Sequence, residues 1–165
     1  MTTFVSVGNA HQPFNRLIDA VVALADRLPQ PIVIQYGHSH CISDRIHRVS
    51  FMNMDDFERK LVQARLLILH AGCGVLINAM RNGRIPVVMA RRKQFGEMVD
   101  DHQVELADAL SAQKKILLAD TSEELWPAIQ KAMTLSTGHK VDVKQRNSFK
   151  AIHATLRKYQ RAFNE

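Results

Sequence analysis

Runs of Val, Ile and Leu alternate along the chain with segments whose apolar residues recur every three or four positions. The runs are continuous, which is typical of parallel strands covered on both faces. They predict strands at residues 4–8, 31–37, 47–52, 66–70, 85–90 and 115–119. The segments between them predict helices at residues 14–28, 55–64, 75–82, 102–112 and 122–135. This alternation predicts an α/β fold with a Rossmann-like, doubly wound parallel sheet.

The same pattern predicts the domain boundaries. Residues 1–135 are expected to form one domain, which suits a chain of 165 residues. Residues 136–147 are polar and predict a connector, and residues 148–165 predict a basic amphipathic helix. The apolar residues of that helix recur at spacings of three and four, and they are Phe149, Ile152, Leu156, Tyr159 and Phe163. Docking on a partner and packing on its own domain are the two interpretations of this helix.

The positive charge of the chain is concentrated near its C-terminus. Residues 139–165 hold seven Lys or Arg and two acidic residues, and they supply +5 of the net charge of +6. A nucleic-acid-binding domain is expected to carry its basic surface on the folded body, so no nucleic-acid partner is expected. A protein partner or an anionic membrane surface suits this tail better.

Targeting signals are not visible in the sequence. The segment MTTFVSVG lacks the basic and apolar regions of a signal peptide, and no apolar run approaches the length of a membrane span. The two cysteines, Cys41 and Cys73, form neither a CxxC motif nor a disulfide framework. These features predict a reduced, cytoplasmic protein.

A first candidate for ligand binding follows the first predicted strand. Gly8 and Asn9 end that strand, and a short loop then leads to the helix that begins near Phe14. Ligands of open α/β sheets bind beyond the carboxyl ends of the strands, where this loop is expected. The simpler interpretation is a turn in which Gly8 only permits the bend.

The strongest local motif is HAGCG, which ends the strand at 66–70 and opens the next helix. Gly72 and Gly74 would let a diphosphate approach the backbone N–H groups of the helix start, where Val75 follows. Cys73 is interpreted either as a nucleophile or as a small packing residue, and His70 either as a base or as a structural histidine. The motif is neither GxGxxG nor a P-loop.

A third cluster follows the predicted strand at 85–90. Arg and Lys can pair with a phosphate or an acidic sugar, and amide and imidazole groups can bind hydroxyls. A solvated, charged loop before a helix is the alternative interpretation. The candidate residues are Arg91, Arg92, Gln94, Phe95, His102 and Gln103.

Metal and nucleophile motifs are absent from the sequence. There is no Asp-x-Asp pair, no HExxH and no GxSxG, and only His38, His40 and Cys41 gather metal-ligand side chains over a short stretch. We therefore expect no metal and no cofactor.

Three segments together carry a family resemblance: FVSVGNAHQPFNRLIDAV, HAGCG and ARRKQFGEMVDDHQVELA. They resemble the C-terminal-domain family of glycosyltransferase family 28, which includes the bacterial lipid II GlcNAc-transferase. Within it they look most like the small subunits of bacterial exopolysaccharide and capsule glycosyltransferases, which pair with a membrane-associated subunit. The catalytic subunit of the eukaryotic dolichol-linked GlcNAc-transferase is a related type.

The resemblance implies one half of a GT-B enzyme that holds a UDP-sugar, which is a substrate. Gly72 and Gly74 would bind the diphosphate, Arg91 would line the sugar-phosphate region, and His102 with Gln103 would bind sugar hydroxyls. Many relatives carry Glu where this chain has Asn78, and an amide can still bond a ribose hydroxyl there. Asn9 stands where a Thr is usual.

The resemblance also implies the reaction and its setting. It implies inverting transfer to a lipid-diphosphate-linked acceptor, with the general base on a membrane-anchored partner at the cytoplasmic face. Glucuronic acid, galactose and N-acetylglucosamine are all candidate sugars. The alternative function is a non-catalytic nucleotide-binding or regulatory module that retains the donor fold.

Overall fold

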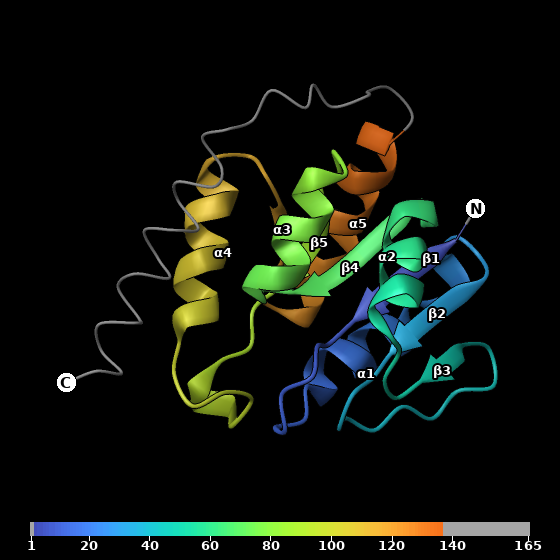
Figure 1. The fold of residues 1–165 in the computed structure, drawn as a ribbon, viewed down its shortest axis with the longest axis horizontal. Coiled ribbons are helices and arrows are strands. Elements are labelled where there is room, and N and C mark those ends of the chain that lie inside the picture. The colour runs from blue at the N-terminus through green and yellow to red at the C-terminus, as the bar shows by residue number, and fades with distance from the viewer. Residues whose placement is uncertain (1, 137–165) are drawn as a thin grey trace.

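Six parallel strands form the central sheet of the protein, in the order β3-β2-β1-β4-β5-β6 (Figure 1). The structure is a computed structural model, and it describes residues 2–136. The strands are β1 (Thr3–Ser6), β2 (Ile32–Gln35), β3 (His47–Val49), β4 (Leu66–His70), β5 (Val87–Met89) and β6 (Leu117–Leu118). The helices are α1 (Asn15–Ala23), α2 (Met54–Gln63), α3 (Cys73–Arg81), α4 (His102–Ala112) and α5 (Ser122–Ser136). This is the predicted Rossmann-like, doubly wound fold.

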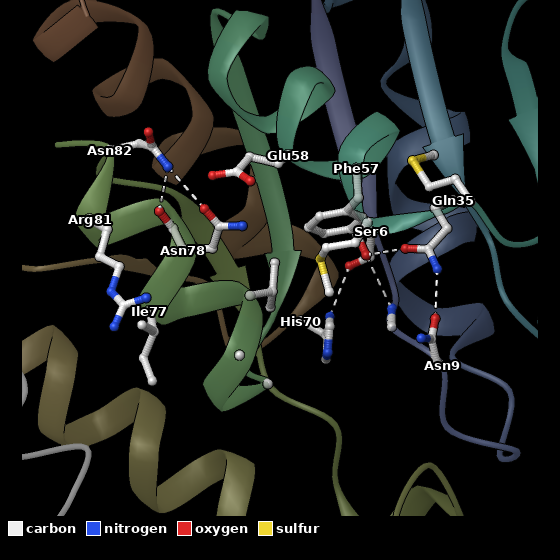
Figure 2. A pocket seen from close by; sticks show the side chains of 16 residues that line it. Ser6, Asn9, Gln35, Phe57, Glu58, His70, Ile77, Asn78, Arg81 and Asn82 are labelled. Atoms are coloured by element: carbon white, nitrogen blue, oxygen red, sulfur yellow. Dashed lines mark hydrogen bonds between the residues drawn. The ribbon is translucent and has the colours of Figure 1, made fainter.

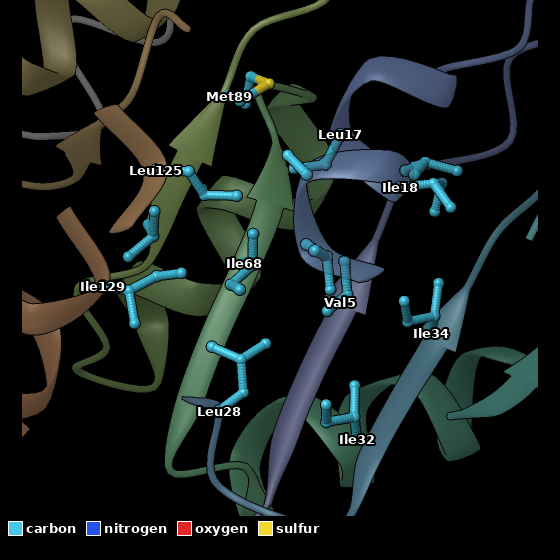
Figure 3. Close-up of a cluster of buried hydrophobic side chains, with 14 of the residues drawn as sticks. Val5, Leu17, Ile18, Leu28, Ile32, Ile34, Ile68, Met89, Leu125 and Ile129 are labelled. Atoms are coloured by element: carbon cyan, nitrogen blue, oxygen red, sulfur yellow. The ribbon is translucent and has the colours of Figure 1, made fainter. Parts of the chain in front are cut away.

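Helices cover both faces of the sheet, so the strands contribute to two hydrophobic cores. On one face α1 and α5 pack against the sheet, with Leu17 and Ile129 above Val5 and Ile68 (Figure 3). On the other face α2, α3 and α4 pack against the alternate strand residues, among them Phe4. Burial on both faces explains why the strands are continuous apolar runs in the sequence.

The elements differ from the predicted ones mainly at their ends. The helix predicted at 14–28 is divided into α1 and a short 3-10 helix, Ala25–Arg27. Leu28 is extended because the following Pro29 disfavours helical backbone before it. The helix predicted at 75–82 begins earlier, at Cys73, with Gly72 as its N-cap. A second 3-10 helix, Lys93–Phe95, was not predicted.

Two predicted elements lie outside the described residues. These are the helix at 148–165 and the connector at 136–147, except that Ser136 is the last residue of α5. None of the helices within residues 2–136 is long and apolar enough to cross a membrane.

Candidate functional site

The sheet has a topological switch point between β1 and β4. The chain passes from β1 to β2 and β3 on one side, and then returns to place β4, β5 and β6 on the other side. Crevices that bind ligands form at this position in open α/β sheets, beyond the carboxyl ends of the strands. A cavity of about 760 Å³ lies there, between the loops after β1 and β4 and the helices α2 and α3 (Figure 2).

The His70 side chain occupies the floor of this cavity, between two glycines. A Cβ atom at Gly8 would lie 2.5 Å from His70 Nε2, and one at Gly72 would lie 2.3 Å from it. Gly8 also has a φ of +80°, which disfavours other residues. Both glycines therefore leave room for the imidazole ring, which the sequence alone did not indicate.

His70 is held as a neutral side chain. Burial lowers its pKa to about 4, with a further lowering by the nearby Arg91 guanidinium. Nδ1 lies 3.2 Å from the carbonyl oxygen of Ser6. Because a carbonyl can only accept, Nδ1 carries the proton and Nε2 is left as an acceptor.

Gly74 differs from the other two glycines because its open side faces the cavity. Among residues 2–136, no atom outside its own helix backbone and its two chain neighbours lies within 4 Å of the position of a Cβ there. It lies in the first turn of α3, whose N-cap, Gly72, makes no side-chain cap hydrogen bond. The first N–H groups of a helix have no partner within the helix, so they and the helix dipole can bind an anion.

Polar side chains line the cavity at both ends. At the β1 end, Ser6 Oγ donates to Gln35 Oε1 at 2.6 Å, and Gln35 Nε2 donates to Asn9 Oδ1 at 2.8 Å. At the α3 end, Asn82 Nδ2 donates to Asn78 Oδ1 at 2.9 Å. Figure 2 shows these two groups on opposite sides of His70.

Several cavity residues were not predicted. Ser6 and Gln35 are polar residues in buried strands, and that unusual placement was the available signal. The others lie just before α2, within α2 and α3, or at the end of α3, where no sequence motif marked them. They are Met52, Met54, Phe57, Glu58, Ile77, Arg81 and Asn82.

Arg91 lies inside the protein rather than in the cavity lining. Its side chain is 1% exposed, and its guanidinium donates to the carbonyl oxygens of Val7 and Gln12, both at 2.7 Å, and of Glu97 at 2.9 Å. Burial lowers its pKa to about 10, and the Glu97 carboxylate opposes this shift. Gln103, 3% exposed, accepts from the Arg91 backbone N–H. Arg91 thus holds the loop after β5 to the loop after β1, and Gln103 holds the start of α4 to Arg91.

Two ion pairs add links at the same edge of the sheet. Arg16 of α1 pairs with Glu97 at 2.8 Å and also donates to the carbonyl oxygens of Ala90 and Asp120. Arg92 pairs with Asp120 at 2.9 Å. Arginine side chains therefore connect the loops after β1, β5 and β6 at the carboxyl edge of the sheet.

The remaining residues of the third cluster lie near the surface. Phe95 is 56% exposed, and the Arg16 guanidinium lies 5.0 Å from the centre of its ring. Gln94 is exposed, and His102 Nδ1 contacts the Asp100 carboxylate. None of these three lines the cavity at the switch point.

The structure thus brings together about half of the predicted site. Seven predicted residues line the cavity: Gly8, Asn9, His70, Gly72, Gly74, Val75 and Asn78. Seven do not: Cys73, Arg91, Arg92, Gln94, Phe95, His102 and Gln103.

Burial raises the pKa of the Cys73 thiol, so the thiolate is disfavoured. Contacts of the predicted site residues with a ligand stay predictions, both for those that line the cavity and for those that do not. Within residues 2–136, no three His, Cys, Asp or Glu side chains are grouped to hold a metal ion.

A doubly wound sheet with a cavity at its switch point defines a Rossmann-like domain of the nucleotide-binding type. Residues 2–156 match the glycosyltransferase family 28 C-terminal domain, and the chain belongs to this family. It is also 28% identical over 138 residues to the UDP-N-acetylglucosamine transferase subunit ALG13 of Yarrowia lipolytica. That alignment covers 76% of this chain and 68% of the relative. The predicted family and fold class are confirmed, and the domain is of the glycosyltransferase type.

Proposed function

We propose that this protein is the UDP-sugar-binding catalytic subunit of a two-component inverting glycosyltransferase. The observation that carries the proposal is the cavity at the switch point, which opens on the start of α3 at Gly74. A diphosphate placed there would receive backbone hydrogen bonds and the positive end of the helix dipole. The family match and the sugar-nucleotide transferase relative support the same ligand class.

The same helix start would assist the chemical step. The acceptor hydroxyl attacks the anomeric carbon, the bond from that carbon to the diphosphate oxygen breaks, and UDP leaves with the electron pair. N–H groups aimed at the departing diphosphate stabilise the charge that develops on it. The acceptor proton passes to a general base that we place on the partner subunit. Independence from a metal ion is part of the proposal, and activity retained in a chelator tests it.

The partner and the acceptor belong to the proposal as well. The relative's name describes a subunit, which supports action of this chain with a second protein. We propose that the second protein is membrane-anchored at the cytoplasmic face and binds a lipid-diphosphate-linked acceptor in exopolysaccharide or capsule synthesis. No nucleic acid takes part.

UDP-N-acetylglucosamine is the first donor to test. It is the donor in the relative's name. Of the basic residues that could pair with an acidic sugar, Arg91 is hydrogen-bonded to backbone carbonyls and Arg92 is paired with Asp120. UDP-galactose and UDP-glucuronic acid are the competing donors.

A charge placed at Gly74 tests the position of the diphosphate. Gly74→Asp would put a carboxylate in the open part of the cavity, whereas Gly74→Asn adds nearly the same bulk without the charge. We expect Gly74→Asp to lose UDP binding in calorimetry, and Gly74→Asn to lose much less, while both keep the circular dichroism spectrum of the parent. UDP affinity unchanged in Gly74→Asp would refute the proposed site.

Reconstitution with the partner tests the two-component assignment. We expect sugar transfer by the pair and none by this chain alone. Transfer by the isolated chain would contradict the two-component reading. A pair that binds UDP but never transfers sugar would favour the alternative, a non-catalytic nucleotide-binding or regulatory module.

A further inference from the structure

One carboxylate lines the cavity among the described residues, and the proposed chemistry has not used it. Glu58 lies in the middle of α2, and its side chain is exposed to the cavity. It makes no hydrogen bond or ion pair with any residue between 2 and 136. A carboxylate without a partner in a ligand cavity is available to accept hydrogen bonds from a ligand.

Glu58 faces the part of α3 that lies beyond the diphosphate position. The helices α2 and α3 pack against each other, and Glu58 and Asn78 line the same end of the cavity (Figure 2). Asn78 follows Gly74 by four residues, which is about 6 Å along a helix. Because Asn78 Oδ1 accepts from Asn82, its Nδ2 remains the group that can donate.

The charges set the direction in which a nucleotide can lie. The start of α3 attracts an anion, whereas the Glu58 carboxylate, which shares the far end of the cavity with the Arg81 side chain, repels one. The group that follows a diphosphate in a nucleoside diphosphate is the ribose, whose two neighbouring hydroxyls are donors. A carboxylate has two oxygens and can accept from both hydroxyls.

We propose that Glu58 recognises the ribose of the bound nucleotide by accepting hydrogen bonds from its vicinal hydroxyls, with Asn78 beside it. This inference rests on the proposed function, because it takes the ligand to be a nucleoside diphosphate. It makes Glu58 a specificity-determining residue that comes from α2, whereas the anion site lies on α3.

Two ligands and two variants test this assignment. The ligands are UDP and its dideoxy form, whose ribose lacks both hydroxyls. The variants are Glu58→Gln and the matched control Asp55→Asn, which removes the same charge from the same helix outside the cavity lining. The parent is expected to bind UDP about tenfold more tightly than the dideoxy form, because the dideoxy form lacks the hydrogen bonds to the charged carboxylate. Glu58→Gln should abolish most of that difference by weakening UDP alone, and Asp55→Asn should preserve it.

The outcomes separate the inference from the proposed function. If the parent binds UDP but Glu58→Gln weakens both ligands equally, or tightens UDP by removing a repulsive charge, the ribose assignment is wrong and the proposed function stands. If the parent binds neither ligand in calorimetry, the proposed function fails and the inference fails with it.

Discussion

Replacing Gly72 with alanine adds one methyl group where the structure leaves space for the His70 imidazole. The new Cβ would lie 2.3 Å from Nε2 and 2.9 Å from Cδ2 of that ring. The ring cannot simply move away, because Gly8 lies on its other side and Nδ1 is bonded to the Ser6 carbonyl oxygen. The contact therefore has to be relieved by shifting the ring, the helix start or both.

The magnitude follows from three contributions. Overpacking of this kind costs about 1–3 kcal/mol, and loss of the hydrogen bond to Ser6 costs about 1 kcal/mol more. Gly72 has φ −75° and ψ 135°, which alanine adopts without strain. Alanine also reduces the conformational entropy of the unfolded chain, and this stabilises the folded variant by about 0.4–1 kcal/mol. We expect Gly72→Ala to lower the free energy of unfolding by about 2 kcal/mol.

Urea unfolding of Gly72→Ala, Gly74→Ala, His70→Ala and the double variant Gly72→Ala/His70→Ala measures this effect. Gly74→Ala is the control, because its Cβ would meet no atom of residues 2–136 within 4 Å outside its own helix and chain neighbours, and alanine is the better helix former, by about 0.5–1 kcal/mol. Gly72→Ala is also measured in a His70→Ala background, where the contact cannot occur. Equal or higher stability of Gly72→Ala would refute the reasoning, and so would an undiminished loss in the His70→Ala background.

Three further predictions concern stability. The pKa of His70 is about 4 in the fold and 6.5 when unfolded, so stability is complete above pH 6.5 and falls by up to about 3 kcal/mol as the pH drops toward 4. In His70→Gln, urea unfolding across that pH window should show a flatter slope. Arg91→Met leaves buried carbonyl groups unpaired and should lower the free energy of unfolding by at least about 3 kcal/mol. The exposed Arg59→Met should lower it by at most about 0.5 kcal/mol, and equal melting temperatures of the two variants would contradict this. Asn53 caps α2 by accepting from Asp56 N at 2.8 Å, so Asn53→Ala should cost about 1 kcal/mol and Asn53→Ser, which keeps a capping oxygen, little, as read by thermal unfolding.

The strands and helices were predictable because each carries a local pattern. Runs such as Leu66–Leu69 are buried on both faces, and the helices between them present apolar residues at helical spacing. The position of HAGCG at the end of β4 followed from the same pattern. Helix ends were less predictable, because they depend on single residues such as Pro29.

The site was only partly predictable, because its remaining residues depend on contacts between distant segments. Arg91 was predicted to line the ligand site, with a solvated loop as the alternative, yet it binds the carbonyl oxygens of Val7 and Gln12, which precede it by 84 and 79 residues. Glu58 belongs to no sequence motif, and the packing of α2 beside α3 places it in the cavity lining. No local spacing reports either arrangement.

The hydrogen bonds from Ser6 to Gln35 and from Gln35 to Asn9 run in one direction. The Ser6 hydroxyl donates a hydrogen bond to Gln35 Oε1, and the Gln35 amide nitrogen therefore lies toward Asn9 Oδ1. The Asn9 amide is oriented in turn, with its oxygen occupied and its nitrogen left as a donor. This side of the cavity consequently has a fixed polarity, which favours a ligand atom with a lone pair, such as a carbonyl or phosphoryl oxygen, and rejects one that carries a proton.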